Sequence, residues 1–279
     1  MPKPLREHRI KHWMARDRIV IVVVGCGGTG AALVTGLPYL HYALLAGGHP
    51  SGIRVCVIDG DRITETNCVR QPFSLGEVGL YKAQVLINRL NLFWGLDWKA
   101  IPQNLTEASI LDRPDIVIGC VDTRAARRVI HSKLTGHQAN TSYWLDLGNH
   151  ATGGQFVLGQ PWNWVNRRCA TRLRTVAELF PELIDESLDK DGQPSCSAVE
   201  ALERQEPFVN PTLAYHALAL LAKLFRHGST EYHGAFVNVA GSRVQPLLAE
   251  PQTWRALRRR GRRHTSRPRA PSARSTTAG

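Results

Sequence analysis

The sequence IVIVVVGCGGTG, at residues 19–30, decides the fold of this chain. Its first half is an uninterrupted β-branched run, which is typical of a parallel strand buried on both faces. The glycines that follow, at Gly25, Gly27, Gly28 and Gly30, let the backbone turn sharply and approach a phosphate where the next helix begins. The pattern predicts a nucleotide site without naming the ligand, and a tight turn with no ligand is the alternative.

Strand-like and helix-like segments alternate on both sides of this loop. The segments expected as further strands are 53–58, 98–101, 116–121, 143–145 and 155–158. The segments expected as the helices between them are 31–47, 81–94 and 123–135. Pro38 is expected to end or kink the first of these helices. Alternation of this kind indicates an α/β fold with a Rossmann-like, doubly wound, mainly parallel sheet.

The second half of the chain departs from this alternation. Residues 161–212 hold several prolines and charged stretches, and we expect a crossover excursion with a short helix near 171–190. The apolar segment 211–225 begins with proline and predicts a helix, and residues 236–248 predict a closing hairpin. The expected organisation is an N-terminal basic arm at 1–18, a folded body at 19–254 and a disordered arginine-rich tail at 255–279.

Positive charge is concentrated in that tail. The chain has 35 Lys and Arg against 23 Asp and Glu, a net charge of +12, and nine of the arginines lie in residues 255–279 without a single acid. The other residues therefore carry only +3. A stretch of this kind could bind the phosphates of nucleic acid without sequence preference, or it could simply be solvated.

The cysteine spacing and the lengths of the apolar runs indicate the cellular compartment of the protein. The six cysteines lie far apart and form no C-x-x-C pair, so neither a disulfide framework nor a structural zinc is expected. No apolar run approaches the roughly 18–20 residues that span a bilayer, and the run at 19–24 is too short for a signal-peptide core. We therefore expect a cytoplasmic protein with reduced thiols and no membrane association.

Two aspartates follow predicted strands. Asp59 comes directly after 53–58, and Asp122 directly after 116–121. Ligands of open α/β sheets bind beyond the carboxyl ends of the strands, so both carboxylates are expected at the edge of one site, with Asp59 placed to bind ribose hydroxyls. The alternative for each is a helix N-cap, and it competes well for Asp122, which Thr123 follows.

A more specific pattern begins at Asp59. The motifs are Asp59-Gly60-Asp61, Asn67-Cys68-Val69-Arg70-Gln71, Gly79-x-x-Lys82-Ala83 and Cys120-Val121-Asp122. With the glycine loop, they closely resemble the signature of the ubiquitin-activating-enzyme-like superfamily, the ThiF/MoeB/E1-like proteins. The resemblance covers about 19–160 and, more loosely, 195–245. It is closest to the ThiF family protein of the PRTRC (ParB-related, ThiF-related cassette) system.

The resemblance implies an ATP-dependent adenylyltransferase that activates the C-terminal carboxylate of a small ubiquitin-like or sulfur-carrier protein, with 19–254 as the adenylation domain. Such a reaction needs cations around the phosphates and a metal ion. By resemblance, the glycine loop, Asp59 and Asp61 would bind the nucleotide, Arg70 and Lys82 would contact the phosphates, Asn67 would support their loop, Gln71 would lie beside it, and Asp122 would bind Mg²⁺. The alternative for Arg70 and Lys82 is a solvated charged face.

Cys196 stands in the sequence Pro194-Ser195-Cys196-Ser197, which resembles the P-x-C-T surroundings of the catalytic cysteine in ubiquitin-activating enzymes. The resemblance implies that its thiolate accepts the acyl group, and an ordinary loop cysteine is the alternative. The chain departs from ThiF and MoeB in lacking their two C-x-x-C zinc pairs. The resemblance also implies a homodimer, in which Arg6, Arg9 or Arg16 could reach the partner's ATP.

Two other functions remain open at this stage. An NAD(P)-dependent oxidoreductase would use the glycine loop and Asp59 equally well, but it would leave Arg70 and Lys82 unexplained, and no hydride-transfer dyad is recognisable. A non-catalytic nucleotide-binding module could use the arginine-rich tail on nucleic acid. Among the remaining residues, Trp162 and Trp164 are expected to be packing residues.

Overall fold

The structure is a computed structural model that describes residues 7–189 and 207–257. An eight-stranded sheet forms its centre, in the order β10-β9-β7-β6-β5-β2-β3-β4. The strands are β2 (Ile19–Val24), β3 (Ile53–Ile58), β4 (Lys99–Ile101), β5 (Ile116–Gly119), β6 (Tyr143–His150), β7 (Gly153–Gly159), β9 (Tyr232–Asn238) and β10 (Arg243–Leu248). The strands from β6 to β4 are parallel, and β7, β9 and β10 are added antiparallel. The expected α/β architecture is confirmed.

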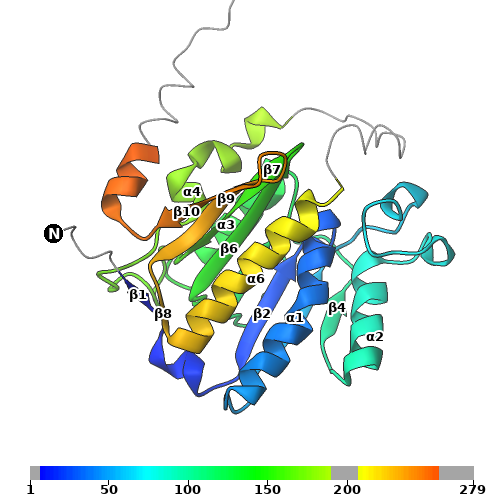
Figure 1. Cartoon of the computed structure of the whole chain (residues 1–279), viewed down its shortest axis with the longest axis horizontal. Coiled ribbons are helices and arrows are strands. Elements are labelled where there is room, and N and C mark those ends of the chain that lie inside the picture. Colours follow the sequence, from blue (N-terminus) through cyan, green and yellow to red (C-terminus); the bar gives the residue numbers. More distant parts are fainter. Residues whose placement is uncertain (1–6, 190–206, 258–279) are drawn as a thin grey trace, which may run out of the picture.

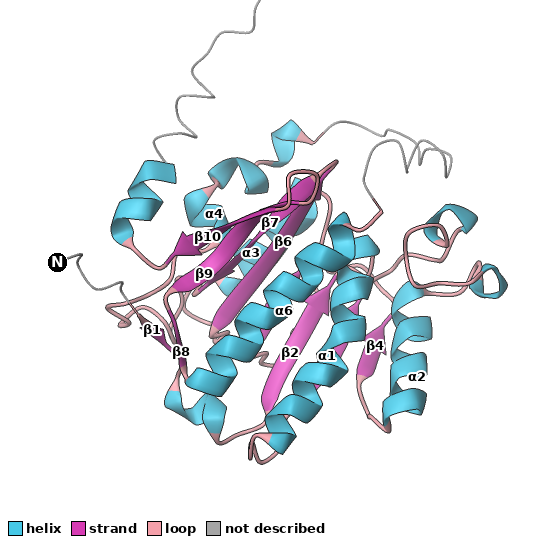
Figure 2. Cartoon of the chain, viewed as in Figure 1, coloured by secondary structure: helices cyan, strands magenta, loops and turns pink. Residues whose placement is uncertain are grey.

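Helices cover both faces of this sheet (Figures 1 and 2). The helices are α1 (Gly28–Ala46), α2 (Lys82–Trp94), α3 (Arg124–Leu134), α4 (Val176–Leu179) and α6 (Val209–His227). The crossover through α1 leads from β2 to β3, whereas the crossover through α3 leads from β5 in the opposite direction, to β6. Because such crossovers are right-handed, α1 and α3 must lie on opposite faces. Helix α6 packs beside α1 across the front of the sheet.

The strand that precedes the glycine loop lies in the middle of the sheet. Ile21 of β2 pairs in register with Val55 of β3 and with Ile116 of β5, and all three side chains are buried. The loop, the start of α1 and the ends of β3 and β5 therefore meet at one edge of the sheet. The change of direction between the two crossovers falls between β2 and β5, where ligands of this fold bind.

Of three expectations about local structure, one is confirmed and two are wrong. Helix α1 does not end at Pro38, which is buried within it, so packing compensates for the hydrogen bond that proline cannot donate. The short helix expected near 171–190 is present as the four-residue α4, and Pro181, which follows it, starts a separate 3₁₀ turn (Pro181–Ile184). Trp162 and Trp164 are not packed: each is 59% exposed.

The ends of the described chain are tied to the body. Strand β1 (His8–Arg9) pairs with β8 (Ser229–Thr230), and Met14 is completely buried. At the other end, residues 251–257 form a helix whose Trp254 packs against His233. Residues 258–279, which hold most of the tail expected to be disordered, lie outside the described residues. No helix in the described part of the chain is long and apolar enough to cross a membrane.

Candidate active site

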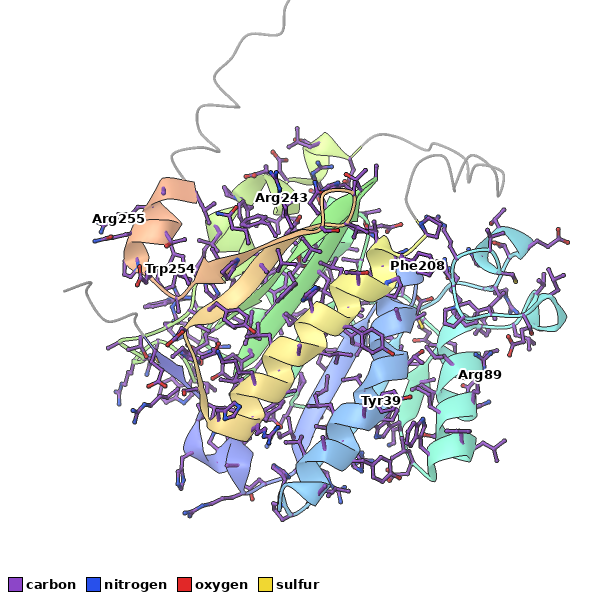
Figure 3. The ribbon with its side chains drawn as sticks, viewed as in Figure 1. Tyr39, Arg89, Phe208, Arg243, Trp254 and Arg255 are labelled. Atoms are coloured by element: carbon purple, nitrogen blue, oxygen red, sulfur yellow. The ribbon has the colours of Figure 1, made fainter. Side chains whose placement is uncertain are left out.

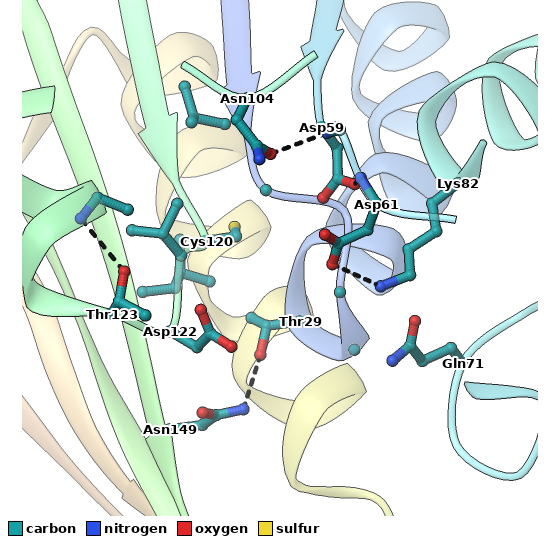
Figure 4. A pocket seen from close by; sticks show the side chains of 18 of the residues that line it. Thr29, Asp59, Asp61, Gln71, Lys82, Asn104, Cys120, Asp122, Thr123 and Asn149 are labelled. Carbon is teal, nitrogen blue, oxygen red and sulfur yellow. Dashed lines mark hydrogen bonds and ion pairs between the residues drawn. The ribbon is translucent and has the colours of Figure 1, made fainter. Parts of the chain in front are cut away.

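A cavity of about 1370 Å³ opens at the carboxyl edge of the central strands (Figure 4). It brings together residues that are distant in the sequence. Those from the sequence prediction are Gly25, Gly27, Gly28, Asp59, Asp61, Asn67, Arg70, Gln71, Lys82 and Asp122. Pockets for small ligands have volumes of about 300–1,000 Å³, so this cavity can hold a nucleotide and part of a second molecule.

The glycine loop has the conformation that the sequence requires. Gly25 has φ +93°, and a Cβ there would lie 2.8 Å from the carbonyl oxygen of Cys120. A Cβ on Gly30 would collide with the carbonyl of Gly25. Gly30 does not line the cavity, so its part is to let α1 start directly against the loop. The first backbone N–H groups of α1 consequently face a cavity in which an anion could bind.

Asp59 holds this loop in place. One of its oxygens, Oδ2, accepts a hydrogen bond from the backbone N–H of Cys26 at 2.5 Å, and Oδ1 accepts one from the backbone N–H of Asp61 at 2.9 Å. Burial raises the pKa of the Asp59 carboxyl, and the two backbone donors oppose that shift. Each carboxylate oxygen can accept more than one hydrogen bond. Asp59 can therefore still bind a hydroxyl group from the cavity.

Lys82 is the buried cation of the site. Its side chain is 7% exposed, and Nζ lies 2.9 Å from Oδ2 of Asp61, whose side chain is 64% exposed. The backbone N–H of Lys82 also donates to the carbonyl of Asp61. The exposed carboxylate can move into solvent at little cost, while the buried ammonium keeps its need for an anion. An incoming phosphate can therefore take the place of Asp61.

The loop between β3 and α2 carries the second cation. Asn67 closes a capping box in which its Oδ1 accepts from the backbone N–H of Thr64 at 3.0 Å, so this side chain fixes the loop. Arg70 and Gln71 follow directly and line the cavity. Oε1 of Gln71 is buried and accepts no hydrogen bond from the described residues. This acceptor faces the cavity beside Lys82 (Figure 4).

Asp122 is an exposed carboxylate at the cavity, and among the described residues no partner is recorded for it. The N-cap of α3 is Thr123, whose hydroxyl accepts from the N–H of Ala126 at 3.2 Å, so the N-cap alternative for Asp122 is wrong. The preceding carbonyl, of Val121, accepts from Nη2 of Arg127 at 2.9 Å, and the Nε of Arg127 donates to the buried Asp146 at 2.9 Å. This buried ion pair fixes the backbone that presents Asp122.

Asp122 fits a magnesium site of the kind in which most ligands come from elsewhere. Mg²⁺ keeps several waters and takes one or two carboxylates together with substrate phosphates. Within residues 7–189 and 207–257 there is no cluster of three His, Cys, Asp or Glu side chains that could hold a metal by itself. A single carboxylate on a rigid backbone matches a magnesium ion that takes its remaining ligands from water and substrate phosphates.

Sequence reasoning missed a group of polar side chains at the cavity. Asn210, at the start of α6, is 2% exposed, and its Oδ1 accepts hydrogen bonds from the hydroxyl of Thr29 at 2.9 Å and from the amide of Asn149. Its Nδ2 lies where a Cβ on Gly28 would be, which explains a glycine at that position. The one signal in the sequence is a polar residue immediately before the Pro211 helix.

Cys196 lies outside the described residues, within 190–206. The chain on either side of that segment is described, and both ends reach the cavity. Before it, Glu186 lines the cavity, and the carboxylate of Asp189 accepts from the N–H groups of Arg124 and Ala125 at the start of α3. After it, Asn210 lines the cavity from α6.

The fold and the cavity define a class: a doubly wound α/β protein whose nucleotide-sized cavity combines a glycine loop, buried and loop-borne cations, and an exposed carboxylate. The profile of the ThiF family matches residues 15–255, and the chain belongs to that family. No curated protein sequence matches the chain at a significant level.

Solved structures resemble this fold. The crystal structure of PaaA has a TM-score of 0.56 at 14% sequence identity, with 83% of this chain and 64% of PaaA covered. MccB of E. coli has a TM-score of 0.53 at 18% identity, with 83% and 62% covered, and MccB with ATP has a TM-score of 0.53 at 17% identity, with 83% and 64% covered. This chain therefore spans less than two thirds of the length of these proteins, and the likeness concerns the fold.

Proposed function

We propose that this chain is an ATP-dependent adenylyltransferase that activates the C-terminal carboxylate of a small ubiquitin-like or sulfur-carrier protein. The observation that carries the proposal is the single cavity that collects the glycine loop, Asp59, Arg70, Lys82 and Asp122. Membership of the ThiF family supports it. So do crystal structures of MccB of E. coli with ATP and with MccA.

In this reaction a carboxylate oxygen of the carrier attacks the α-phosphorus of ATP. The bond from that phosphorus to the bridging oxygen breaks, and an acyl adenylate and pyrophosphate are formed. Asp59 would bind the ribose, and Lys82 would exchange Asp61 for the phosphates. Arg70, Lys82 and the first N–H groups of α1 would neutralise charge on the phosphates as it shifts to the leaving pyrophosphate. Asp122 would hold Mg²⁺, which supplies further charge neutralisation when bound.

The polar side chains of Thr29, Asn149 and Asn210 would orient the second substrate. Thr29 and Asn149 lie across the glycine loop from Lys82 (Figure 4), and Asn210 accepts hydrogen bonds from both. The Nδ2 group of Asn210 is held beside the backbone of Gly28. Amide donors at this place can bind the carboxylate of the carrier next to the α-phosphate. A reaction between two substrates needs its reacting groups to be positioned in this way.

We also propose that Cys196 accepts the activated acyl group. Its thiolate would attack the acyl carbon, AMP would leave with the bonding electrons, and a thioester would form. The support is that both described ends of the segment 190–206 reach the cavity. A Cys196→Ser variant should replace a thioester that is sensitive to thiols with a stable ester, and Cys169→Ser, which changes a half-buried cysteine elsewhere, should leave the thioester unchanged.

The finer features carried by the sequence resemblance stay predictions. They are a homodimer, the PRTRC placement and a cytoplasmic location. Size-exclusion chromatography with light scattering tests the first, and a mass equal to one 31.0 kDa chain at micromolar concentration would contradict it.

The adenylation step itself is tested by exchange of labelled pyrophosphate into ATP, with Mg²⁺ and small carrier proteins from the same genome. Exchange should require a carrier and should be lost in Arg70→Ala and Asp122→Ala. Matched controls are Arg226→Ala and Asp112→Ala, which remove an exposed arginine and an exposed aspartate outside the cavity. Binding of NAD(P) without binding of ATP would contradict the proposal and favour an oxidoreductase.

A further inference from the structure

Trp162 and Trp164 form a surface feature that the proposed reaction does not use. Both are 59% exposed, although tryptophan is normally among the more buried residues. The guanidinium of Arg167 lies 3.8 Å from the ring centroid of Trp164, and that of Arg172 lies 5.1 Å from the ring centroid of Trp162. The two indoles present exposed flat aromatic surface, and Arg167 adds positive charge beside Trp164, whereas Arg172 is buried and paired with Glu178.

This loop is built to hold a fixed shape. Nδ2 of Asn166 donates to the carbonyls of Thr141, Ser142 and Pro161 at 3.1–3.2 Å, and Nδ2 of Asn163 donates to those of Leu134 and Thr141. Both asparagines are buried. A loop fixed by two fully bonded buried amides keeps its tryptophans in place, so their exposure is a property of the folded chain.

The surface around the two tryptophans is positively charged, and it extends to Arg255 on the helix at 251–257. Arg172 and Arg174 both bind Glu178, and the helix at 251–257 packs there, since Arg174, Glu178 and Arg255 line one pocket. Arg255 points away from the body (Figure 3). Arg167 and Arg168 add two further cations. Eight more arginines follow Arg255 in residues 258–279.

The surface is remote from the nucleotide cavity. The amides of the loop bond to residues 141 and 142, at the start of β6, whereas Asn149 and His150, at its other end, line the cavity. Seven strand residues at about 3.3 Å each separate the two places by about 23 Å. A ligand at the tryptophans would therefore bind independently of ATP.

We propose that Trp162, Trp164, Arg167, Arg168, Arg174 and Arg255 form a binding surface for single-stranded nucleic acid. Exposed aromatic rings stack on bases of any sequence, and neighbouring cations follow the phosphates, which is the combination that binds single strands. The charge favours a polyanion over an apolar partner. Duplex nucleic acid keeps its bases stacked inside and cannot use the tryptophans.

The test is fluorescence anisotropy of a labelled oligothymidine of about 20 nucleotides with the full-length protein in a salt series starting at about 50 mM. Stacking contributes enough that Trp162→Ala combined with Trp164→Ala should weaken binding at least about ten-fold, while the slope of log Kd against log salt stays the same. Changing the eight arginines of residues 258–279 to serine should lower that slope and leave the effect of the tryptophans. The control is Phe93→Ala, which removes a 78% exposed aromatic residue on α2.

Equal thermal midpoints would show that the tryptophan variant is folded. The proposal would be overturned if that variant bound oligothymidine as tightly as the unchanged protein, since the tail alone would then carry the binding. Equally tight binding of a duplex would overturn it as well. So would displacement of the oligonucleotide by excess ATP and Mg²⁺, because binding would then be in the cavity. A change in oligomeric state without a change in binding would show an interface between copies of the chain instead.

Discussion

Stability of the folded chain should fall as the pH is lowered from about 7.5 to 5.5, and His233 should account for a defined part of the loss. His233 is completely buried, and Nδ1 donates to the carbonyl of Leu158 at 2.7 Å. Nε2 accepts from the indole N–H of Trp254 at 2.9 Å. Both ring nitrogens are therefore satisfied in the neutral form. Burial lowers the pKa of His233 from 6.5 to about 4.

The magnitude follows from that shift. Below pH 6.5 the unfolded chain binds a proton at this position, whereas the folded chain resists it until about pH 4, so stability is present above 6.5 and is lost as the pH falls. At pH 5.5 the two values correspond to a loss of about 1.4 kcal/mol. The loss reaches about 3 kcal/mol at pH 4 and is complete only below that pH.

The assay is urea unfolding followed by tryptophan fluorescence, at several pH values, for the unchanged protein and for His233→Gln. The variant should be less stable at pH 7.5, but its free energy of unfolding should depend less on pH. Between pH 7.5 and 5.5 it should lose about 1.4 kcal/mol less than the unchanged protein loses. Other groups, such as His131, whose pKa burial also lowers, contribute equally to both proteins and cancel. Identical pH dependence in the two proteins would refute the reasoning.

Three further predictions concern the candidate active site. Lys82→Ala should lower pyrophosphate exchange at least about 100-fold, because it removes the buried cation that the phosphates would meet; exchange within two-fold of the unchanged protein would contradict its proposed role. Arg127→Met should lower the free energy of unfolding by about 3–5 kcal/mol, because it leaves the carboxylate of Asp146 buried and unpaired, and Arg127→Met combined with Asp146→Leu should recover part of this loss in urea unfolding. Gly25→Ala should abolish ATP binding in calorimetry, since φ +93° and the nearby Cys120 carbonyl both exclude a Cβ; ordinary affinity in that variant would show that the loop does not hold the phosphates.

The sequence predicted the central sheet and much of the cavity because those features depend on local chemistry. A β-branched run before a glycine loop favours a buried strand, and two of the glycines after it are required by the backbone: Gly25 by its positive φ and Gly30 by its contact with the carbonyl of Gly25. Asp59 and Asp122 were placed correctly at the cavity edge because each follows the carboxyl end of a strand, β3 and β5 respectively. The wrong alternative for Asp122 arose because Thr123, which caps α3, stands directly beside it.

What the sequence did not predict depends on contacts between distant residues. Asn210 bonds to Thr29, which lies 181 residues away, and an asparagine before a proline carries no sign of such a partner. The exposure of Trp162 and Trp164 was missed for the same reason. The exposure depends on the loop conformation, which the carbonyls of Thr141 and Ser142 fix through the amide of Asn166. The residue type of a tryptophan, taken alone, favours burial instead.

The two proposed binding places differ in how their charge is arranged, and one titration can separate them. In and behind the cavity, Lys82 is matched by Asp61 and Arg127 by Asp146. Around Trp162 and Trp164, Glu178 is the acid shared by Arg172 and Arg174. The sequence of residues 255–279 holds nine arginines and no acid. Salt screens exposed, unmatched charge far more than buried pairs. Raising the salt concentration should therefore release single-stranded nucleic acid long before it lowers ATP binding, and parallel loss of both would mean that one site binds both ligands.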